Sequence, residues 1–270
     1  MPRAVSYRNV VQKPEPGAVQ VIARAIAVLK ACNRLGPGLS LGEIAREVDL
    51  PRSTVQRIVQ ALSEGGFLVS GSRWRSVTLG PDLLVMGAEA AGRVVELAYP
   101  SLKALAGQTG ETVDLARLNR DHMVFVNQVA GAHRLQAVSA VGDTFPLHCT
   151  ANGKAALALL DDESLRRALA ERLLRFTANT LTDHRQLLRQ VKEVRAGAVA
   201  ADLEEHTLGI CALGLGFMDH TRQIYAVSIP IPAVRFAAMR KRCAPLLHEA
   251  VAQIRQRLNH EADLRRFGAE

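Results

Sequence analysis

Two short stretches of apolar residues, spaced as on one face of a helix, dominate the pattern between residues 41 and 62. In each stretch apolar residues recur at positions i, i+3, i+4 and i+7, which places them on one side of an α-helix. They are Leu41, Ile44, Ala45 and Val48 in the first stretch, and Val55, Ile58, Val59 and Leu62 in the second. The pattern therefore predicts two consecutive helices that pack against one core.

The segment Asp49-Leu50-Pro51 separates these two helices. Proline cannot continue the first helix but suits the start of the second, and we expect Asp49 or Ser53 to cap that second helix. Packing both apolar faces inward leaves these residues outside: Arg52, Ser53, Thr54, Gln56, Arg57 and Gln60. Such side chains contact base edges and phosphates. The segment predicts a helix-turn-helix whose second helix enters the major groove of DNA.

A basic hairpin is expected next. Gly65 and Gly66 can supply the positive φ of a helix end, and residues 67–70 and 75–79 are predicted as two short strands around a turn. Arg73 and Arg75 lie near its tip, where they would contact the phosphate backbone or the minor groove. The alternative is a plain helical hairpin with a solvated basic face. The turn, the exposed residue types and the order of elements favour DNA binding.

Composition supports this interpretation. A length of 270 residues suggests about two domains, and 48% hydrophobic residues suffice for a core in each. Residues 1–80 hold 11 Lys and Arg against 5 Asp and Glu, so most of the net charge of +8 lies in the segment with the helix-turn-helix. Aromatic residues make up only 4%, which argues against stacking on single-stranded nucleic acid as the main activity.

Cysteine usage and hydropathy indicate a cytoplasmic protein. The four cysteines, Cys32, Cys149, Cys211 and Cys243, form no CxxC pair, so neither a zinc site nor a disulfide framework is expected. No apolar run reaches about 18 residues, and the N-terminal segment lacks the apolar core of a signal peptide. We expect no membrane association, no cofactor and no metal, and we interpret residues 1–17 as a mobile arm.

Two further helices flank the helix-turn-helix in the prediction. Apolar spacing from Val19 to Leu29 indicates a first helix that ends near residues 36–38. Residues 81–99 form an alanine-rich linker helix that Pro100 is expected to interrupt. Its small residues allow close packing, either within the chain or against another subunit. A helix-turn-helix commonly reads a split site through a two-fold partner, which favours a dimer.

From residue 111 the hydrophobic period changes to that of strands. Strands are expected at 112–118, 123–129 and 135–140, followed by helices at about 151–160, 163–175 and 183–196. A hairpin of 210–218 and 223–229 and an amphipathic helix at 234–258 complete the chain. This order predicts an α+β domain with a largely antiparallel sheet.

The stretch VGDTFPLHCTANGKAALALL carries the most chemistry in the C-terminal half. Thr150 or Asn152 would cap a helix that continues through Gly153, which leaves backbone N–H groups free to face a pocket. Such a helix start attracts carboxylate or phosphate. An ordinary capped helix with no ligand is the alternative.

In order along the chain, several motifs together resemble the IclR-type bacterial transcriptional regulators. They are the helix-turn-helix, the alanine-rich linker, "G-x-x-x-P-L-H-x-T-A-x-G-K-A", "D-L-E-E-H-T-L-G-I" and "A-V-S-I-P-I-P-x-x-R-F". The resemblance covers about residues 19–258. It implies a winged helix-turn-helix joined by a linker helix to a GAF-like effector domain. It also implies a homodimer or dimer of dimers that binds an operator in double-stranded DNA under the control of a small organic acid.

The resemblance also implies an effector pocket in the C-terminal half. The family's pocket positions fall on Leu147, Ala151, Asn152, Asp202 and Ser228, and Thr150 and Cys211 are included as candidates. A pocket cysteine of some members aligns nearer Ala212, one residue from Cys211, and a second pocket serine is replaced by Pro230. A one-residue shift on a strand turns a side chain to the other face. The replacement suggests an effector less polar than a two-carbon keto acid.

Two other functions are compatible with parts of the sequence. An enzyme would use Cys149 with His148, but neighbouring side chains point apart and buried cysteines mostly act as small hydrophobic groups, so no catalytic residue is assigned. His148, His206 and Asp202 show no metal-ligand spacing. Alternatively, the C-terminal half only oligomerises and binds no ligand. The expected domains are a winged helix-turn-helix at 18–80, a linker at 81–99, an effector domain at 100–262 and a tail at 263–270.

Overall fold

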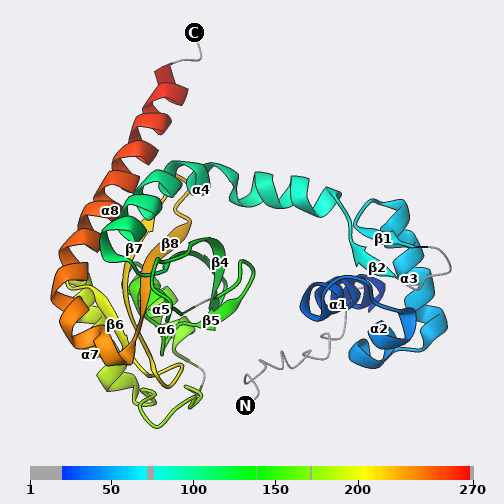
Figure 1. The fold of residues 1–270 in the computed structure, drawn as a ribbon, viewed down its shortest axis with the longest axis horizontal. Coiled ribbons are helices and arrows are strands. Elements are labelled where there is room, and N and C mark those ends of the chain that lie inside the picture. The colour runs from blue at the N-terminus through cyan, green and yellow to red at the C-terminus, as the bar shows by residue number, and fades with distance from the viewer. Residues whose placement is uncertain (1–19, 72–75, 138, 171, 268–270) are drawn as a thin grey trace. The chain divides into compact units, whose positions relative to one another are not determined.

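The computed structural model describes residues 20–71, 76–137, 139–170 and 172–267. The chain divides into two compact units, with the boundary at Ala90 (Figure 1). The expected N-terminal arm at 1–17 and the hairpin tip with Arg73 and Arg75 lie outside the described residues. Among the described helices, none has the length and apolar character needed to cross a bilayer.

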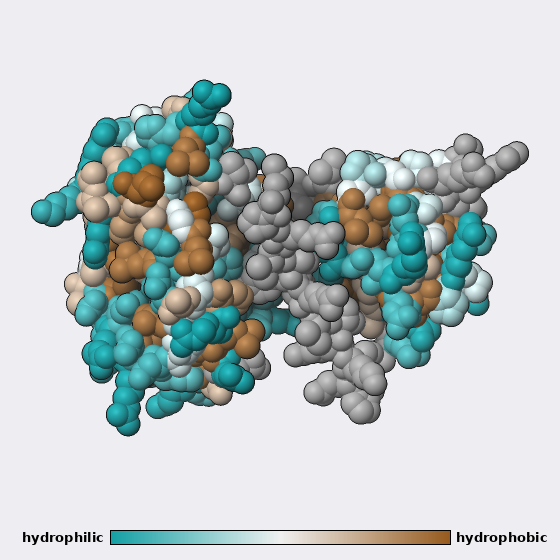
Figure 2. Space-filling view, turned by 60° about the horizontal axis from the view of Figure 1, so that its bottom comes forward, coloured by the Kyte–Doolittle hydropathy of each residue, from teal (hydrophilic) through white to brown (hydrophobic). Residues whose placement is uncertain are grey.

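The N-terminal unit contains three helices and a two-stranded hairpin. They are α1 (Gln20–Leu35), α2 (Leu41–Val48), α3 (Arg52–Glu64), β1 (Leu68–Ser70) and β2 (Val77–Leu79). The two strands pair antiparallel, and Leu39 forms a further bridge to Val77. The core confirms both predicted apolar stripes, because it contains Val28, Cys32, Leu39, Leu41, Ile44, Val55, Ile58, Val59, Leu68 and Val77. On the outside, α1 exposes Val21, Ile22 and Ile26. Figure 2 shows one face of the molecule, on which hydrophobic and hydrophilic residues are interspersed.

The turn between α2 and α3 differs from the prediction in its caps. Ser40 and Glu43 form a reciprocal capping box at the start of α2. Asp49 ends α2 in the left-handed conformation at φ 51°, and its N–H donates to the Ala45 carbonyl. Pro51 is the N-cap of α3, and no side chain of the described residues caps that helix, so the expectation that Asp49 or Ser53 does so is wrong. Asp49 is already committed to the end of α2.

The C-terminal unit is built on a six-stranded antiparallel sheet, which confirms the predicted α+β class. The strand order is β5-β4-β3-β8-β7-β6. The bounds are β3 (Val113–Asn119), β4 (His122–Val129), β5 (Thr144–Pro146), β6 (Ala200–Leu203), β7 (Ile210–Met218) and β8 (Ile224–Pro232). The sequence did not predict β6. The strand expected at 135–140 is wrong, because the described part of this segment is a loop and the edge strand is β5.

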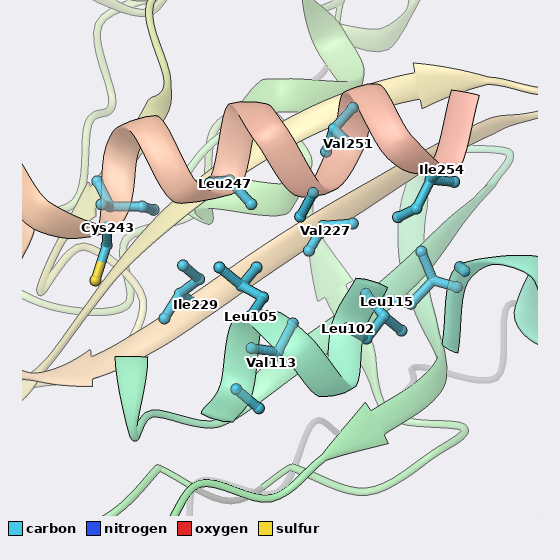
Figure 3. Close-up of a cluster of buried hydrophobic side chains, with 14 of the residues drawn as sticks. Leu102, Leu105, Val113, Leu115, Val227, Ile229, Cys243, Leu247, Val251 and Ile254 are labelled. Atoms are coloured by element: carbon cyan, nitrogen blue, oxygen red, sulfur yellow. The ribbon is translucent and has the colours of Figure 1, made fainter. Parts of the chain in front are cut away.

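Helices cover both faces of this sheet. On one face lie α8 (Ala233–Phe267) and the C-terminal part of α4 (Asp82–Thr109), and on the other lie α5 (Ala151–Leu157), α6 (Asp162–Ala168) and α7 (His184–Arg195). Alternate strand residues face the two layers. Figure 3 shows the first layer, where α8 and α4 meet strands β3 and β8 through Leu102, Leu105, Val113, Leu115, Val227, Ile229, Cys243, Leu247, Val251 and Ile254.

The linker helix does not stop at Pro100. α4 continues to Thr109 with Pro100 inside it, so the predicted interruption is wrong. An internal proline costs a helix about 3 kcal/mol. Burial of Ala98, Leu102 and Leu105 against the sheet offsets that cost, because each large apolar side chain contributes about 1.5–3 kcal/mol when fully buried.

Glycines in β7 allow α5 to lie directly on the sheet. A Cβ atom at Gly214 would be 2.6 Å from the Ala151 carbonyl oxygen, and one at Gly216 would be 2.8 Å from the Ala155 carbonyl oxygen. All seven residues of α5 are buried as a result. The first two predicted helices of this layer are longer than observed, since α5 ends at Leu157 and α6 at Ala168.

Candidate functional site

The outer face of α3 presents the residues that the sequence singled out. Arg52, Ser53, Gln56, Arg57 and Gln60 are exposed and Thr54 is half-exposed. On the opposite side of the same helix, Val55, Ile58 and Val59 are buried in the core. The helix therefore separates a structural face from a polar face that is open to a partner.

The side chains on the polar face of α3 form few hydrogen bonds or ion pairs among the described residues. Gln60 donates to Glu64 at 3.0 Å, whereas within the described residues neither Arg52 nor Arg57 forms an ion pair. Pro51 provides no side-chain cap, and the N–H groups of the first turn have no side-chain partner among the described residues. Free N–H groups and uncommitted guanidinium groups are what a phosphate backbone and base edges require.

The hairpin of β1 and β2 supports the predicted wing only as far as it is described. The Gly71 N–H donates to the Ser76 carbonyl at 2.8 Å, which closes the hairpin at the edge of its turn. Arg73 and Arg75 stand between these two residues, outside the described part of the chain. Their contact with DNA stays a prediction.

A cavity of about 380 Å³ lies in the C-terminal unit, between the start of α5 and the strands. It brings together five predicted pocket residues: Thr150, Ala151, Asn152, Asp202 and Ser228. The sheet register explains this, because Ser228 pairs with Asp114 and Asp202 pairs with Ala212. The remaining lining residues are Asp114, Phe125, Gln136, Ala137, Ser139, Asp143, Phe145, His206, Thr207, Ile210, Ala212 and Pro230.

Two predicted residues do not line this cavity. Cys211 belongs to the core on the α4 and α8 face, whereas its neighbour Ala212 faces the cavity. Successive strand residues point to opposite faces, so placing Cys211 in the pocket is wrong. Leu147 packs in the core of the α5 layer and is likewise absent from the lining.

At the start of α5, Thr150 is the N-cap. Its hydroxyl accepts from the Gly153 N–H at 3.1 Å and donates to the Pro146 carbonyl at 2.7 Å. Asn152 lies inside the helix and is 3% exposed. Its Oδ1 atom has no hydrogen-bond partner among the described residues.

A buried ion pair holds α5 against the loop after β6. Lys154 Nζ donates to Glu205 at 2.6 Å and to Gln190 at 2.9 Å, and the Lys154 and Glu205 side chains are only 1% and 4% exposed. The Glu205 N–H in turn donates to Asp202 Oδ1 at 2.7 Å. This chain of contacts orients Asp202 at the cavity and neutralises the cation of α5.

Two carboxylates of the cavity, those of Asp114 and Asp202, have raised pKa values. Burial raises the pKa of Asp114 to about 7, although the hydrogen bond from Gln128 favours its charged form and lowers it. Burial likewise raises the pKa of Asp202 to about 7. Burial lowers the pKa of His206, which therefore carries no positive charge at neutral pH. The cavity thus contains titrating acids and a neutral imidazole.

The structure does not favour the thiol chemistry considered for Cys149. This side chain is fully buried, and burial raises the pKa of its thiol. The His148 ring forms a hydrogen bond of 2.9 Å with the Leu174 carbonyl oxygen. Within the described ranges, no group of three His, Cys, Asp or Glu side chains could hold a metal ion.

Sequence reasoning missed several lining residues, above all Asp114, Asp143, Phe125 and Phe145. Asp114 carried a usable signal, because it is a charged residue inside the apolar run V-D-L-A of β3. A charge at a buried strand position usually has a partner or a function. Asp143 and Gln136 gave no comparable signal, since they come from a loop whose path depends on the fold.

Together the two units define a class of protein: a winged helix-turn-helix followed by a mixed α/β domain with a cavity, the architecture of a transcriptional regulator. Two family descriptions match the chain, "Bacterial transcriptional regulator IclR C-terminal" over residues 90–256 and "IclR helix-turn-helix domain" over residues 21–71. The chain belongs to the IclR family of transcriptional regulators.

Individual relatives agree with this assignment. The HTH-type transcriptional regulator Rv1719 of Mycobacterium tuberculosis is 43% identical, covering 83% of this chain and 87% of its own. The HTH-type transcriptional regulator TtgV of Pseudomonas putida is 38% identical over 81% and 84%. An IclR homolog from Microbacterium hydrocarbonoxydans, solved with 4-hydroxybenzoate, shares the fold with a TM-score of 0.79 at 22% identity, over 89% of this chain and 99% of its own.

Proposed function

We propose that this IclR-type regulator binds an operator in double-stranded DNA through α3 and the wing, and that a small organic effector in the C-terminal cavity changes that binding. The observation that carries the DNA-binding part is the exposed face of α3. Arg52, Thr54, Gln56 and Arg57 would contact base edges or phosphates, with Ser53 and Gln60 beside them. Arg73 and Arg75 would hold the phosphate backbone.

Selection of bound DNA from a random duplex pool tests this assignment. Arg57→Ala should weaken operator binding by about 1–3 kcal/mol and relax the preference at one base pair. Arg167→Ala removes another exposed arginine, from α6, and serves as the control. If Arg57→Ala binds the selected operator as the wild type does, α3 is not the recognition helix.

We also propose that the protein acts as a homodimer or a dimer of dimers in the cytoplasm. A palindromic operator would present two half-sites to two copies of α3. The exposed apolar side chains of α1, Val21, Ile22 and Ile26, are suited to such a subunit contact. Sedimentation velocity at micromolar concentration tests this proposal. The proposal is contradicted if the protein is a monomer both in the absence and in the presence of operator DNA.

The effector would occupy the cavity at Asn152, Asp202 and Ser228. The fold of the Microbacterium hydrocarbonoxydans homolog, which was solved with 4-hydroxybenzoate, supports a ligand-binding role for a domain of this kind. For regulation, the effector must bind one arrangement of the two DNA-binding units more tightly than another. Organic acids, which the family resemblance implies, are the first compounds to screen by thermal shift.

The screen also separates this proposal from a C-terminal domain that only oligomerises. A true effector should stabilise the wild type and lose most of that shift in Ser228→Ala and Asn152→Leu, because both side chains line the cavity. Undiminished shifts in both variants would place the ligand elsewhere. An oligomerisation domain predicts no shift with any compound.

A further inference from the structure

The charges around the cavity are of one sign. Three aspartates line it, Asp114, Asp143 and Asp202, and among the described lining residues there is no lysine or arginine. Lys154, the cation of α5, is held by Glu205 at 2.6 Å and by Gln190. Burial lowers the pKa of His206, so this ring adds no positive charge. A carboxylate ligand would therefore meet like charges and no compensating cation.

Three residues that line the cavity, Asp114, Asn152 and Gln136, each have an acceptor atom that forms no hydrogen bond within the described residues. Asp114 uses Oδ1 to accept from Gln128 at 2.7 Å, and no hydrogen bond involves its other oxygen within the described residues. Asn152 Oδ1 and Gln136 Oε1 are also buried, and within the described residues neither atom has a hydrogen-bond partner. A buried acceptor without a partner has lost its hydrogen bonds to water and gained none in return, which destabilises the protein. A ligand that donates hydrogen bonds would remove that destabilisation.

Aromatic rings form one wall of the cavity. The rings of Phe125 and Phe145 stack with centroids 4.5 Å apart, and the His206 ring lies 5.2 Å from that of Phe145. Ile210 and Pro230 add apolar surface to the lining. A flat apolar body fits such a wall, since aromatic pairs gain energy at these separations.

We propose that the cavity selects an aromatic ligand whose polar group is a hydrogen-bond donor, a hydroxyl or an amine, in place of the carboxylate that the family resemblance implies. The donor would bond to Asp114, Asp202 or Asn152, and the ring would pack on Phe125 and Phe145. This inference rests on the proposed effector site and names the chemical class that fits it.

The experiment must be run where the two buried aspartates are ionised. Burial raises the pKa of Asp114 and of Asp202 to about 7, so below that pH either group could donate a proton to a carboxylate. The charge of Asp143 also raises the pKa of Asp114, and that of Glu205 raises the pKa of Asp202. The backbone N–H groups of Glu205 and His206 and the charge of Lys154 lower the pKa of Asp202. Titration at about pH 8 removes this route for binding an acid.

Isothermal titration calorimetry of the full chain with matched probes tests the proposal. The probes are 4-propylphenol, 4-propylbenzylamine, 4-propylbenzoate and propylbenzene, which share one apolar body. We expect the phenol or the amine to bind about tenfold more tightly than both the benzoate and propylbenzene, a difference of about 1.4 kcal/mol. The phenol and the amine together distinguish a neutral donor from a cationic one.

Charge-neutral variants locate the contact. Asp114→Asn and Asp202→Asn should each weaken the preferred donor probe several-fold and strengthen the benzoate. Asp121→Asn removes an exposed aspartate at the β3–β4 turn and should change neither. The proposal is overturned if the benzoate binds the wild type as tightly as the donor probes, if no probe binds, or if the two cavity variants behave like the control.

Operator binding by the same preparations, measured by fluorescence anisotropy, distinguishes a wrong ligand class from a wrong proposed function. A preparation that binds its selected operator but shows no preference for donor probes contradicts the ligand class alone. A preparation that binds no duplex in preference to others contradicts the proposed function itself. A donor probe that changes operator affinity supports both.

Discussion

The two candidate sites differ in the environment of their polar side chains, which is exposed on the outer face of α3 and buried in the cavity of the C-terminal unit. On α3, Arg52 and Arg57 lie outside a helix whose other side forms the core, so their identities contribute little to folding. In the C-terminal unit, Asp114 and Asp202 are 1% and 6% exposed and belong to the interior of the domain. Recognition and stability are therefore separable in the first unit and coupled in the second, because desolvation penalises every buried charge.

The largest expected effect comes from breaking the buried ion pair of the C-terminal unit. Lys154→Met leaves Glu205 buried without its cation, which should lower the free energy of unfolding by about 3–5 kcal/mol. Urea denaturation measures this loss, and the double variant Lys154→Met, Glu205→Gln should recover part of it. Arg167→Met breaks the exposed pair with Glu163 and should cost under about 1 kcal/mol. If breaking the buried pair and breaking the exposed pair lower the free energy of unfolding equally, burial does not set the contribution of these charges.

Next in size is the pH dependence that Asp114 confers. Its pKa is about 7 in the folded protein against 3.8 for a free side chain, so the folded state binds the proton more tightly. The stability from this protonation is complete below about pH 4 and is lost as the pH rises through 7. Relative to Asp114→Asn, the wild type should lose about 2–4 kcal/mol between about pH 4.5 and pH 8.

Urea denaturation across that pH range measures this difference, with Asp121→Asn as the control. The hydrogen bond with His122 lowers the pKa of Asp121, so its titration falls below the range tested. If the free energy of unfolding depends on pH in the same way in the wild type and in Asp114→Asn, burial does not raise the pKa of Asp114.

A smaller effect is expected where α5 meets the sheet. Gly214→Ala would place a Cβ atom 2.6 Å from the Ala151 carbonyl oxygen, and the overpacking should cost about 1–3 kcal/mol and weaken effector binding. Gly107→Ala in α4 meets nothing within 4 Å and should stabilise the helix by up to about 1 kcal/mol. Thermal denaturation of both variants measures this contrast, and a stabilising Gly214→Ala would show that α5 can move away from β7.

The smallest effect belongs to the exposed face of α3. Arg57→Ala and Gln56→Ala should each change the free energy of unfolding by less than about 0.5 kcal/mol, since neither side chain is buried. The same variants should weaken operator binding, so stability and affinity are measured on one preparation. A large loss of stability would show that this face has a structural role within the protein.

Local patterns in the sequence predicted the N-terminal unit almost completely. The spacing of Leu41, Ile44, Val55 and Ile58 specifies two amphipathic helices, and the polar face of α3 follows once those residues are buried. The hairpins of the C-terminal sheet and the cap at Thr150 were also predictable, because strand alternation and capping depend on neighbours in the chain.

Only the tertiary structure decided the composition of the cavity. Asp114 reaches it because β3 pairs with β8, a strand more than a hundred residues later, and Asp202 because β6 pairs with β7. The Lys154–Glu205 pair and the continuation of α4 through Pro100 also depend on packing between distant segments. Periodicity determines which side of an element is buried, whereas the fold determines which other residues that side meets.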